Sequence, residues 1–224
     1  EEVDGAKCTE LGVDSVRRST GGGAVLHEHE LTYSFVCSEQ SGIVPRNILE
    51  SYRKICNSLV LGFAHMGLSA SFVPLNDIIV NGKKISGNAQ TRREKVVLQH
   101  GTILLGVDVD KMFSMLLVPN EKMKGKIIED VKQRVTSVEN ETGKAAQFSD
   151  VAAAMKKGFE QNFGAELEEG ALTAQERQDD HDGIPAEPDN CPVKWTPDQR
   201  DGDKDGAGDG CDNCSMAPAL SPAA

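Results

Sequence analysis

The stretch DIIVNGKKISG, residues 77 to 87, restricts the fold of this chain more than any other part of its sequence. Asn81-Gly82 stands between two runs that suit β-strands, and this dipeptide in such a setting is the strongest short-range signal for a β-hairpin. We therefore expect two antiparallel strands, one on either side of the turn.

Hydrophobic spacing predicts further strands and helices along the body of the chain. The runs LTYSFV (31 to 36) and VVLQHGTILL (96 to 105) have the β-branched and aromatic character of strands. Apolar residues at spacings of three and four predict a helix that Pro45 opens and a later helix that Ser149 caps and Gly164 ends. A short helix is expected over 110 to 117. The body is therefore predicted to be a mixed α/β (α+β) domain, with hairpins and helices on one face and without a βαβ repeat.

Charge separates this body from a C-terminal tail. The 224 residues carry a formal net charge of -11, and residues 178 to 214 hold eleven acidic and three basic residues. A balance this acidic argues against nonspecific binding of nucleic acid.

The sequence contains no run of eighteen apolar residues, so no membrane span is predicted, and no charged-then-apolar leader opens it.

The glycine run in VRRSTGGGAVLH, residues 16 to 27, is the first candidate site. Glycine gives up more freedom on folding than any other residue, which favours a loop here rather than a strand. Backbone amides between cationic side chains suit an anion with an organic body, such as a nucleotide phosphate. The run matches neither the Rossmann nor the P-loop glycine pattern.

Three dense stretches, RRSTGGGAVLH, NDIIVNGKKISGNAQ and LQHGTILL, follow one another in the order and at the spacing of the lipoate–protein ligase family. The chain resembles this family, which is related to biotin ligases and octanoyltransferases, over residues 1 to 175. The resemblance implies the class II synthetase-like mixed sheet with packed helices of biotin and lipoate ligases. We expect the domain to be incomplete at its N-terminus and to lack the small C-terminal accessory domain found in some ligases. Other members carry that domain as a separate protein, which is then a possible partner.

The resemblance also implies roles for individual residues. Lys84 matches the family's central catalytic lysine, which contacts both the acyl carboxylate and the adenylate phosphate. Asn76 and Asp77 match a pair beside the phosphates, and Asp77 would hold Mg²⁺. The other positions that match ATP- or lipoyl-binding residues are Arg17, Arg18, Gly21, Gly22, Gly23, Ala24, Val25, Leu26, His27, Ser86, Gly87, Gln99, His100, Gly101 and Thr102.

The function that this resemblance implies is an ATP-dependent ligase. It would form lipoyl-AMP from lipoate and ATP with Mg²⁺, and then transfer the lipoyl group to a specific lysine of a lipoyl-domain protein. The acceptors would be 2-oxo acid dehydrogenase acyltransferase subunits or the glycine cleavage H protein. A fixed cation such as Lys84 suits this chemistry because two anions must meet at the α-phosphate.

An octanoyltransferase of the same fold is the nearest alternative. Such enzymes use a cysteine thioester, and those that resemble this chain carry the cysteine shortly before the strand with the central lysine. That region here reads SASFVPLND and holds no cysteine, while Cys56 lies on a helical segment whose apolar face is expected to be packed. These residues favour the ligase.

The tail, residues 176 to 215, has a different chemistry. DGDKDGAGDGCDNC has the spacing of oxygen ligands in a calcium loop, and with the preceding residues it resembles a thrombospondin type 3 repeat, a fold with little hydrophobic core. The resemblance implies a Cys191–Cys211 disulfide. Residues 216 to 224 are expected to be disordered. The expected Ca²⁺ ligands are Asp180, Asp182, Asp189, Asp201, Asp203, Asp205, Ala207, Asp209 and Asp212.

The two parts imply different compartments. A ligase of this family implies the cytoplasm, whereas disulfides and calcium repeats belong outside the cell. An extracellular calcium-binding structural module with a vestigial ligase domain is therefore a second alternative.

Overall fold

The computed structural model describes residues 3–16, 18, 20–117, 124–171 and 173. The chain divides into two compact units, Glu1–Leu167 and Glu168–Ala224, and the elements below belong to the first. The second, which contains the predicted calcium ligands and the Cys191–Cys211 pair, lies almost wholly outside the described residues, and so do all of those predicted positions.

One antiparallel sheet forms the centre of the first unit. Its strands stand in the order β1-β5-β4-β3-β2, and every neighbouring pair runs antiparallel. The absence of a βαβ repeat was predicted correctly for this part of the chain. The bounds are β1 Glu30–Ser38, β2 Ala70–Val73, β3 Asp77–Val80, β4 Lys83–Arg93 and β5 Val96–Leu104.

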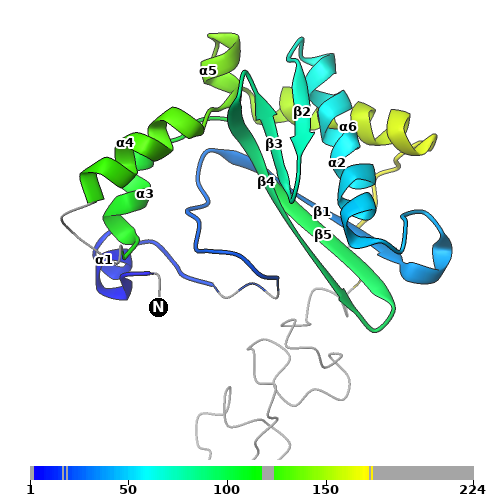
Figure 1. Cartoon of the computed structure of the whole chain (residues 1–224), viewed down its shortest axis with the longest axis horizontal. Coiled ribbons are helices and arrows are strands. Elements are labelled where there is room, and N and C mark those ends of the chain that lie inside the picture. Colours follow the sequence, from blue (N-terminus) through cyan, green and yellow to red (C-terminus); the bar gives the residue numbers. More distant parts are fainter. Residues whose placement is uncertain (1–2, 17, 19, 118–123, 172, 174–224) are drawn as a thin grey trace, which may run out of the picture. The chain divides into compact units, whose positions relative to one another are not determined.

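Helices lie on both sides of this sheet rather than on one (Figure 1). Helices α2 and α6 pack against each other and against one face, where Leu59, Phe63, Ile103 and Met155 form the main core. The other side is flanked by α3 and α4 (Figure 1), so the expectation of helices on a single face is wrong. The helices are α1 Gly5–Glu10, α2 Ile48–His65, α3 Val109–Met115, α4 Lys124–Arg134, α5 Val138–Thr142 and α6 Phe148–Phe163, with a 3-10 turn at Glu39–Ser41.

The predicted hairpin is confirmed. Strands β3 and β4 are joined by Asn81 and Gly82, whose φ angles are 49° and 78°. Both central residues of a type I′ turn need a positive φ, which Asn and Gly adopt more easily than other residues.

The helix starts differ from those predicted. Helix α2 begins at Ile48 instead of Pro45, because the Asn47 side chain accepts a hydrogen bond from the Glu50 amide at 3.0 Å and caps the helix there. Helix α6 begins at Phe148, so Ser149 lies inside its first turn and does not cap it. Its predicted end is confirmed, since Gly164 has φ 61°.

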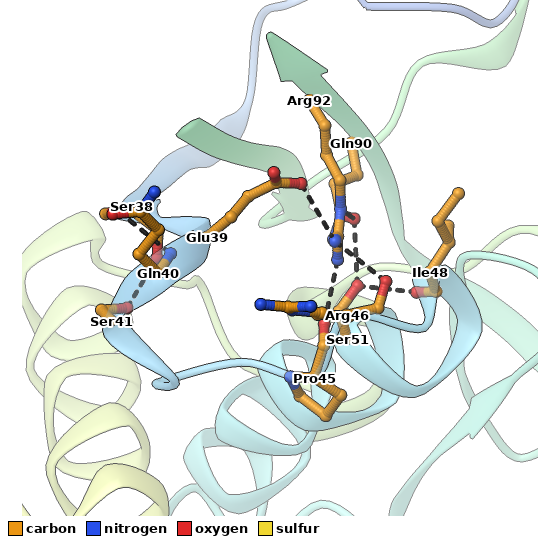
Figure 2. Close-up of polar contacts among 10 residues, drawn as sticks. All are labelled: Ser38, Glu39, Gln40, Ser41, Pro45, Arg46, Ile48, Ser51, Gln90 and Arg92. Carbon is orange, nitrogen blue, oxygen red and sulfur yellow. Dashed lines mark hydrogen bonds and ion pairs between the residues drawn. The ribbon is translucent and has the colours of Figure 1, made fainter. Parts of the chain in front are cut away.

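Arg92 explains why the segment before α2 has a fixed course. Its guanidinium donates to the carbonyl oxygens of Arg46 at 2.9 Å and Pro45 at 3.0 Å, and it pairs with Glu39 at 3.2 Å (Figure 2). The segment that leads into α2 is therefore held against strand β4 by the hydrogen bond between the Pro45 carbonyl group and Arg92.

The second two-residue turn, between β4 and β5, gives a stability prediction. Glu94 and Lys95 have φ angles of 50° and 65° there, a region that costs ordinary residues about 1 kcal/mol each. We expect Glu94→Asn combined with Lys95→Gly to raise the thermal midpoint by about 2–4 °C, which corresponds to about 1 kcal/mol for a domain of this size. Scanning calorimetry measures this shift, and an unchanged or lower midpoint would contradict the strain argument.

Candidate functional site

A cavity of about 430 Å³ lies on the face of the sheet opposite α2 and α6. Its floor is formed by β4 and β5, where Ala89 pairs with His100 and Gly87 pairs with Thr102. The glycine loop before β1 forms one wall. Apolar side chains of α3, α4 and their flanks form the other, namely Val109, Met112, Phe113, Leu116, Val131 and Val135.

Most of the predicted site residues meet in this cavity. The three dense stretches of sequence all contribute to its lining, although they are far apart in the chain. The predicted residues that line it are Arg18, Gly21, Gly22, Gly23, Ala24, Val25, Leu26, His27, Asn76, Lys84, Gly87, His100, Gly101 and Thr102. Arg17 lies outside the described residues.

Gln99 and Ser86 do not line this cavity. Both are completely buried on the face toward α2, because successive residues of a strand point to opposite faces. The Gln99 amide donates to the Tyr33 hydroxyl at 2.8 Å and accepts from Gln90 at 2.9 Å. The structure therefore places Gln99 and Ser86 outside the lining of this cavity.

Lys84 reaches the cavity through an irregularity of strand β4. The register with β3 shifts between Ile78 and Ile79, so that Ile78 pairs with Ser86 while Ile79 pairs with Lys84. A β-bulge of this kind changes the direction of the side chains. It allows Ile85 and Ser86 both to be buried, while Lys84 and Gly87 both face the cavity. In a regular strand, residues that are three positions apart, such as Lys84 and Gly87, would point to opposite faces.

Asp77 is the direct partner of Lys84. Lys84 Nζ lies 2.7 Å from Asp77 Oδ1, and the two side chains are 41% and 35% exposed. Such a pair keeps an ammonium group fixed yet accessible from the cavity. The carboxylate that was predicted to hold Mg²⁺ is thus engaged by a lysine. No three His, Cys, Asp or Glu side chains converge on a possible metal position among the described residues.

A buried polar network holds the loop that carries Asp77. Asn76 and Asn88 bond reciprocally, from each side-chain amide to the other residue's carbonyl oxygen, at 2.5 and 2.9 Å. The Tyr33 hydroxyl donates to Asn88 Oδ1 at 2.7 Å. Gly101 leaves room for Asn88, since a Cβ atom there would lie 2.9 Å from Asn88 Cγ and 2.7 Å from the Gly87 carbonyl oxygen. The position of the Lys84–Asp77 pair therefore depends on residues from three strands and from the turn before β3, which the sequence did not indicate.

The glycine loop is held by polar contacts at both ends. The Arg18 guanidinium donates to the Gly23 carbonyl oxygen at 2.8 Å, across Gly22, whose φ is 114°. Thr20 Oγ1 lies 2.6 Å from His100 Nε2. Burial, with the nearby charges of Arg18 and His27, lowers the pKa of His100, so its imidazole is neutral at neutral pH.

Gly87 gives a direct test of how closely Lys84 must be placed. A Cβ atom at this position would lie 2.9 Å from Lys84 Cε and 3.0 Å from Nζ, so Gly87→Ala displaces the ammonium group. We expect the catalytic activity that depends on Lys84 to fall by about 100-fold, since a shift of about 1 Å in a site can cost that much. The thermal midpoint should change little because a flexible side chain gives way. Gly5→Ala is the matched control, as nothing lies within 4 Å of a Cβ atom there. Equal activities of the two variants would show that the position of Lys84 is not critical.

An antiparallel sheet that carries an apolar cavity with a fixed lysine suits a catalytic domain that binds and transfers an acyl group. A family model, the lipoyl protein ligase A/B catalytic domain, matches residues 1–160. The chain belongs to this family.

The curated relatives carry the name of one branch of the family. The octanoyltransferase LipM of Geobacillus kaustophilus is 36% identical over 200 residues, which cover 79% of this chain and 72% of the relative. The octanoyltransferase LipM of Bacillus subtilis is 34% identical over 184 residues, covering 72% and 66%.

Solved structures agree on the fold. A bipartite lipoate protein ligase from Thermoplasma acidophilum, studied with its E2 lipoyl domain, has a TM-score of 0.71 at 30% identity and covers 79% of this chain and 68% of its own. Lipoate-protein ligase A bound with ATP has a TM-score of 0.65 at 27% identity, covering 79% and 70%.

These findings correct two predictions. The named relatives are octanoyltransferases, so the ATP-dependent lipoate ligase is replaced by its stated alternative, and ATP, lipoate and Mg²⁺ are withdrawn as cofactors. Ca²⁺ is withdrawn as a cofactor as well. The family match ends at residue 160, so the thrombospondin-type repeat over 176 to 215 stays a prediction. No described helix is long and apolar enough to cross a membrane.

Proposed function

We propose that this protein transfers an octanoyl group to the side-chain amine of a lysine on a lipoyl-domain protein. The observation that carries the proposal is the cavity, with an apolar wall from α3 and α4 and with Lys84, the ion-pair partner of Asp77, in its lining. Octanoyltransferase relatives support the acyl group, and the ligase studied with its E2 lipoyl domain supports the acceptor.

The cavity suits an acyl chain of this length. About 430 Å³ is within the usual range for small-molecule sites, and the lining includes Met112, Phe113 and Leu116. Burial of the apolar part of an octanoyl group contributes about 0.8 kcal/mol per carbon, or about 5 kcal/mol for the tail. The acyl carbonyl would then lie at Lys84, whose charge stabilises the oxyanion that forms during transfer.

Without ATP, the octanoyl group must arrive in an activated form, and a thioester is the chemical class that fits. The test mixes the protein with an octanoyl thioester and an apo lipoyl domain, and follows the mass of the acceptor. We expect one octanoyl group to be added to one lysine. A parallel reaction with free lipoate, ATP and magnesium should leave the acceptor unmodified. Modification in that second reaction alone would overturn the proposal.

Chain length gives a further prediction. A butanoyl thioester has four methylene groups fewer than the octanoyl thioester, a loss of about 3 kcal/mol of burial. We expect kcat/KM to fall by about 100-fold, with the change mainly in KM, because the tail is bound equally before and during the reaction. Initial rates over a range of both thioesters measure this ratio. Equal values would mean that the apolar wall does not select the acyl chain.

A further inference from the structure

The main chain of Lys84 is held by a segment that lies far from it in the sequence. Residues 135–137 join α4 to α5, and the Thr136 amide donates to the Lys84 carbonyl oxygen at 2.8 Å. Val135 forms an isolated parallel bridge with Lys84 and also lines the cavity. A bulge disrupts the hydrogen-bond ladder between strands, and the shift in register between β3 and β4 lies at this point. The segment therefore supports the main chain of Lys84 where the sheet supports it least.

This segment is itself firmly fixed. Thr136, Ser137 and Val138 are all buried, and Val138 belongs to the main core of the domain. The Glu139 amide donates to the Leu105 carbonyl oxygen, just after the end of β5, at 3.0 Å. Displacement of the segment would expose these buried groups, so it provides a stable support for Lys84.

The Glu141 side chain connects this segment to the hairpin that carries Lys84. Its Oε1 atom accepts from the Thr136 hydroxyl at 2.6 Å, and its Oε2 atom accepts from Asn81 Nδ2 at 2.6 Å. Asn81 belongs to the turn between β3 and β4, three residues before Lys84. Hydrogen bonds to a carboxylate are stronger than those between neutral groups. One side chain of α5 thus ties the turn that precedes Lys84 to the segment that holds its carbonyl group.

We infer that Glu141 is a positioning residue for Lys84 and acts through Thr136 and Asn81. Glu141 is not among the residues that line the cavity, so its effect on catalysis passes through the main chain of the lysine. It fixes the distance between the Lys84 ammonium group and the cavity wall at Val135, and hence the place of the acyl carbonyl relative to the charge. The inference rests on the proposed function and adds the residue that holds the lysine in place.

Substitution of Glu141 tests this role. Glu141→Ala removes both acceptors, and we expect kcat to fall by about tenfold while KM for the octanoyl thioester stays within about twofold, because the apolar wall that binds the tail is unchanged. Glu141→Gln keeps an acceptor for Asn81 and a donor for the Thr136 hydroxyl, so it should restore kcat to within about threefold. Glu129→Ala is the matched control, since its carboxylate pairs with Lys132 on the exposed surface of α4. An unchanged kcat in Glu141→Ala would overturn the inference.

A double-mutant cycle separates positioning from a general structural role. If Glu141 acts through Lys84, Glu141→Ala should lower the residual rate by less than about twofold when it is combined with Lys84→Met, because the ammonium group that it positions is gone. A general disturbance of the domain would lower the rate by the same factor with and without Lys84. That result would also overturn the inference.

The position of Lys84 can be measured without turnover as well. In protein whose lysines carry an NMR-active carbon isotope at Cε, the Lys84 signal is the one that is missing from Lys84→Met. We expect this signal to shift in Glu141→Ala and to stay in place in Glu129→Ala, and an unmoved signal in Glu141→Ala would contradict the positioning role. If the original protein modifies no acceptor, the proposed function fails, whereas this spectrum still shows whether Glu141 positions the lysine.

Discussion

Replacement of Lys84 by methionine is expected to lower octanoyl transfer by about 100- to 1,000-fold, the usual cost of removing one fixed donor from an oxyanion. Methionine keeps most of the apolar stem while it removes the charge beside Asp77, 2.7 Å away. Because this interaction strengthens only as the carbonyl oxygen becomes negative, the loss should fall on kcat rather than on KM. Transfer rates measured by acceptor mass over a range of thioester concentrations separate the two constants.

Lys83→Met is the matched control for this experiment. It makes the same change at the preceding residue of β4, where the side chain is exposed and does not line the cavity. We expect this variant to keep its activity. An equal loss in both variants would indicate a general effect of charge on this strand, and an active Lys84→Met enzyme would remove Lys84 from the mechanism.

The sequence was sufficient to predict the parts of the fold that local chemistry decides. Asn81-Gly82 specified its turn because few other dipeptides adopt positive φ at both positions. Gly164 ended α6 for a similar reason. Glu94 and Lys95 make the equivalent turn with unsuitable residues, and there the pairing of β4 with β5 overrides local preference.

The site could be predicted only in part, because the direction in which each side chain points decides whether that residue belongs to the site. Gln99 and His100 belong to one motif, yet strand alternation places them on opposite faces of the sheet. The bulge that turns Lys84 and Gly87 to the same side has no signal in the sequence. Met112 and Phe113 fall within the short helix expected over 110 to 117, but only tertiary packing shows that they line the cavity.

The distinction between ligase and transferase could not come from the shared motifs. A fixed lysine, a glycine loop and an apolar pocket serve equally for an acyl adenylate and an acyl thioester, because both place a developing oxyanion at the same cation. The absence of a cysteine before β3 favoured the ligase, on the assumption that an octanoyltransferase needs that thiol. What favours the transferase is instead the name of the relatives, octanoyltransferase LipM.

The sheet that carries the site is supported by α2 and α6, which approach each other closely at two glycines. A Cβ atom on Gly158 would lie 2.5 Å from the Gly62 nitrogen and 2.9 Å from its Cα atom, and it would also collide with the Ser58 carbonyl oxygen. Helix propensity alone would make Gly158→Ala stabilising by about 1 kcal/mol. Because the obstructing atoms belong to the backbone of α2, the helices must instead move apart.

We expect Gly158→Ala to lower the free energy of unfolding by about 3 kcal/mol, the upper part of the usual range for overpacking. The midpoint should fall by about 10 °C, and transfer activity measured well below that temperature should fall less than in Lys84→Met, because the substitution is on the opposite side of the sheet from the cavity. Gly125→Ala in α4, where a Cβ atom meets nothing within 4 Å, should be neutral or slightly stabilising. Urea unfolding of both variants measures these free energies of unfolding. A Gly158→Ala protein as stable as the original would mean that helix propensity outweighs the contact, and that the close approach of α2 and α6 does not determine the stability of the domain.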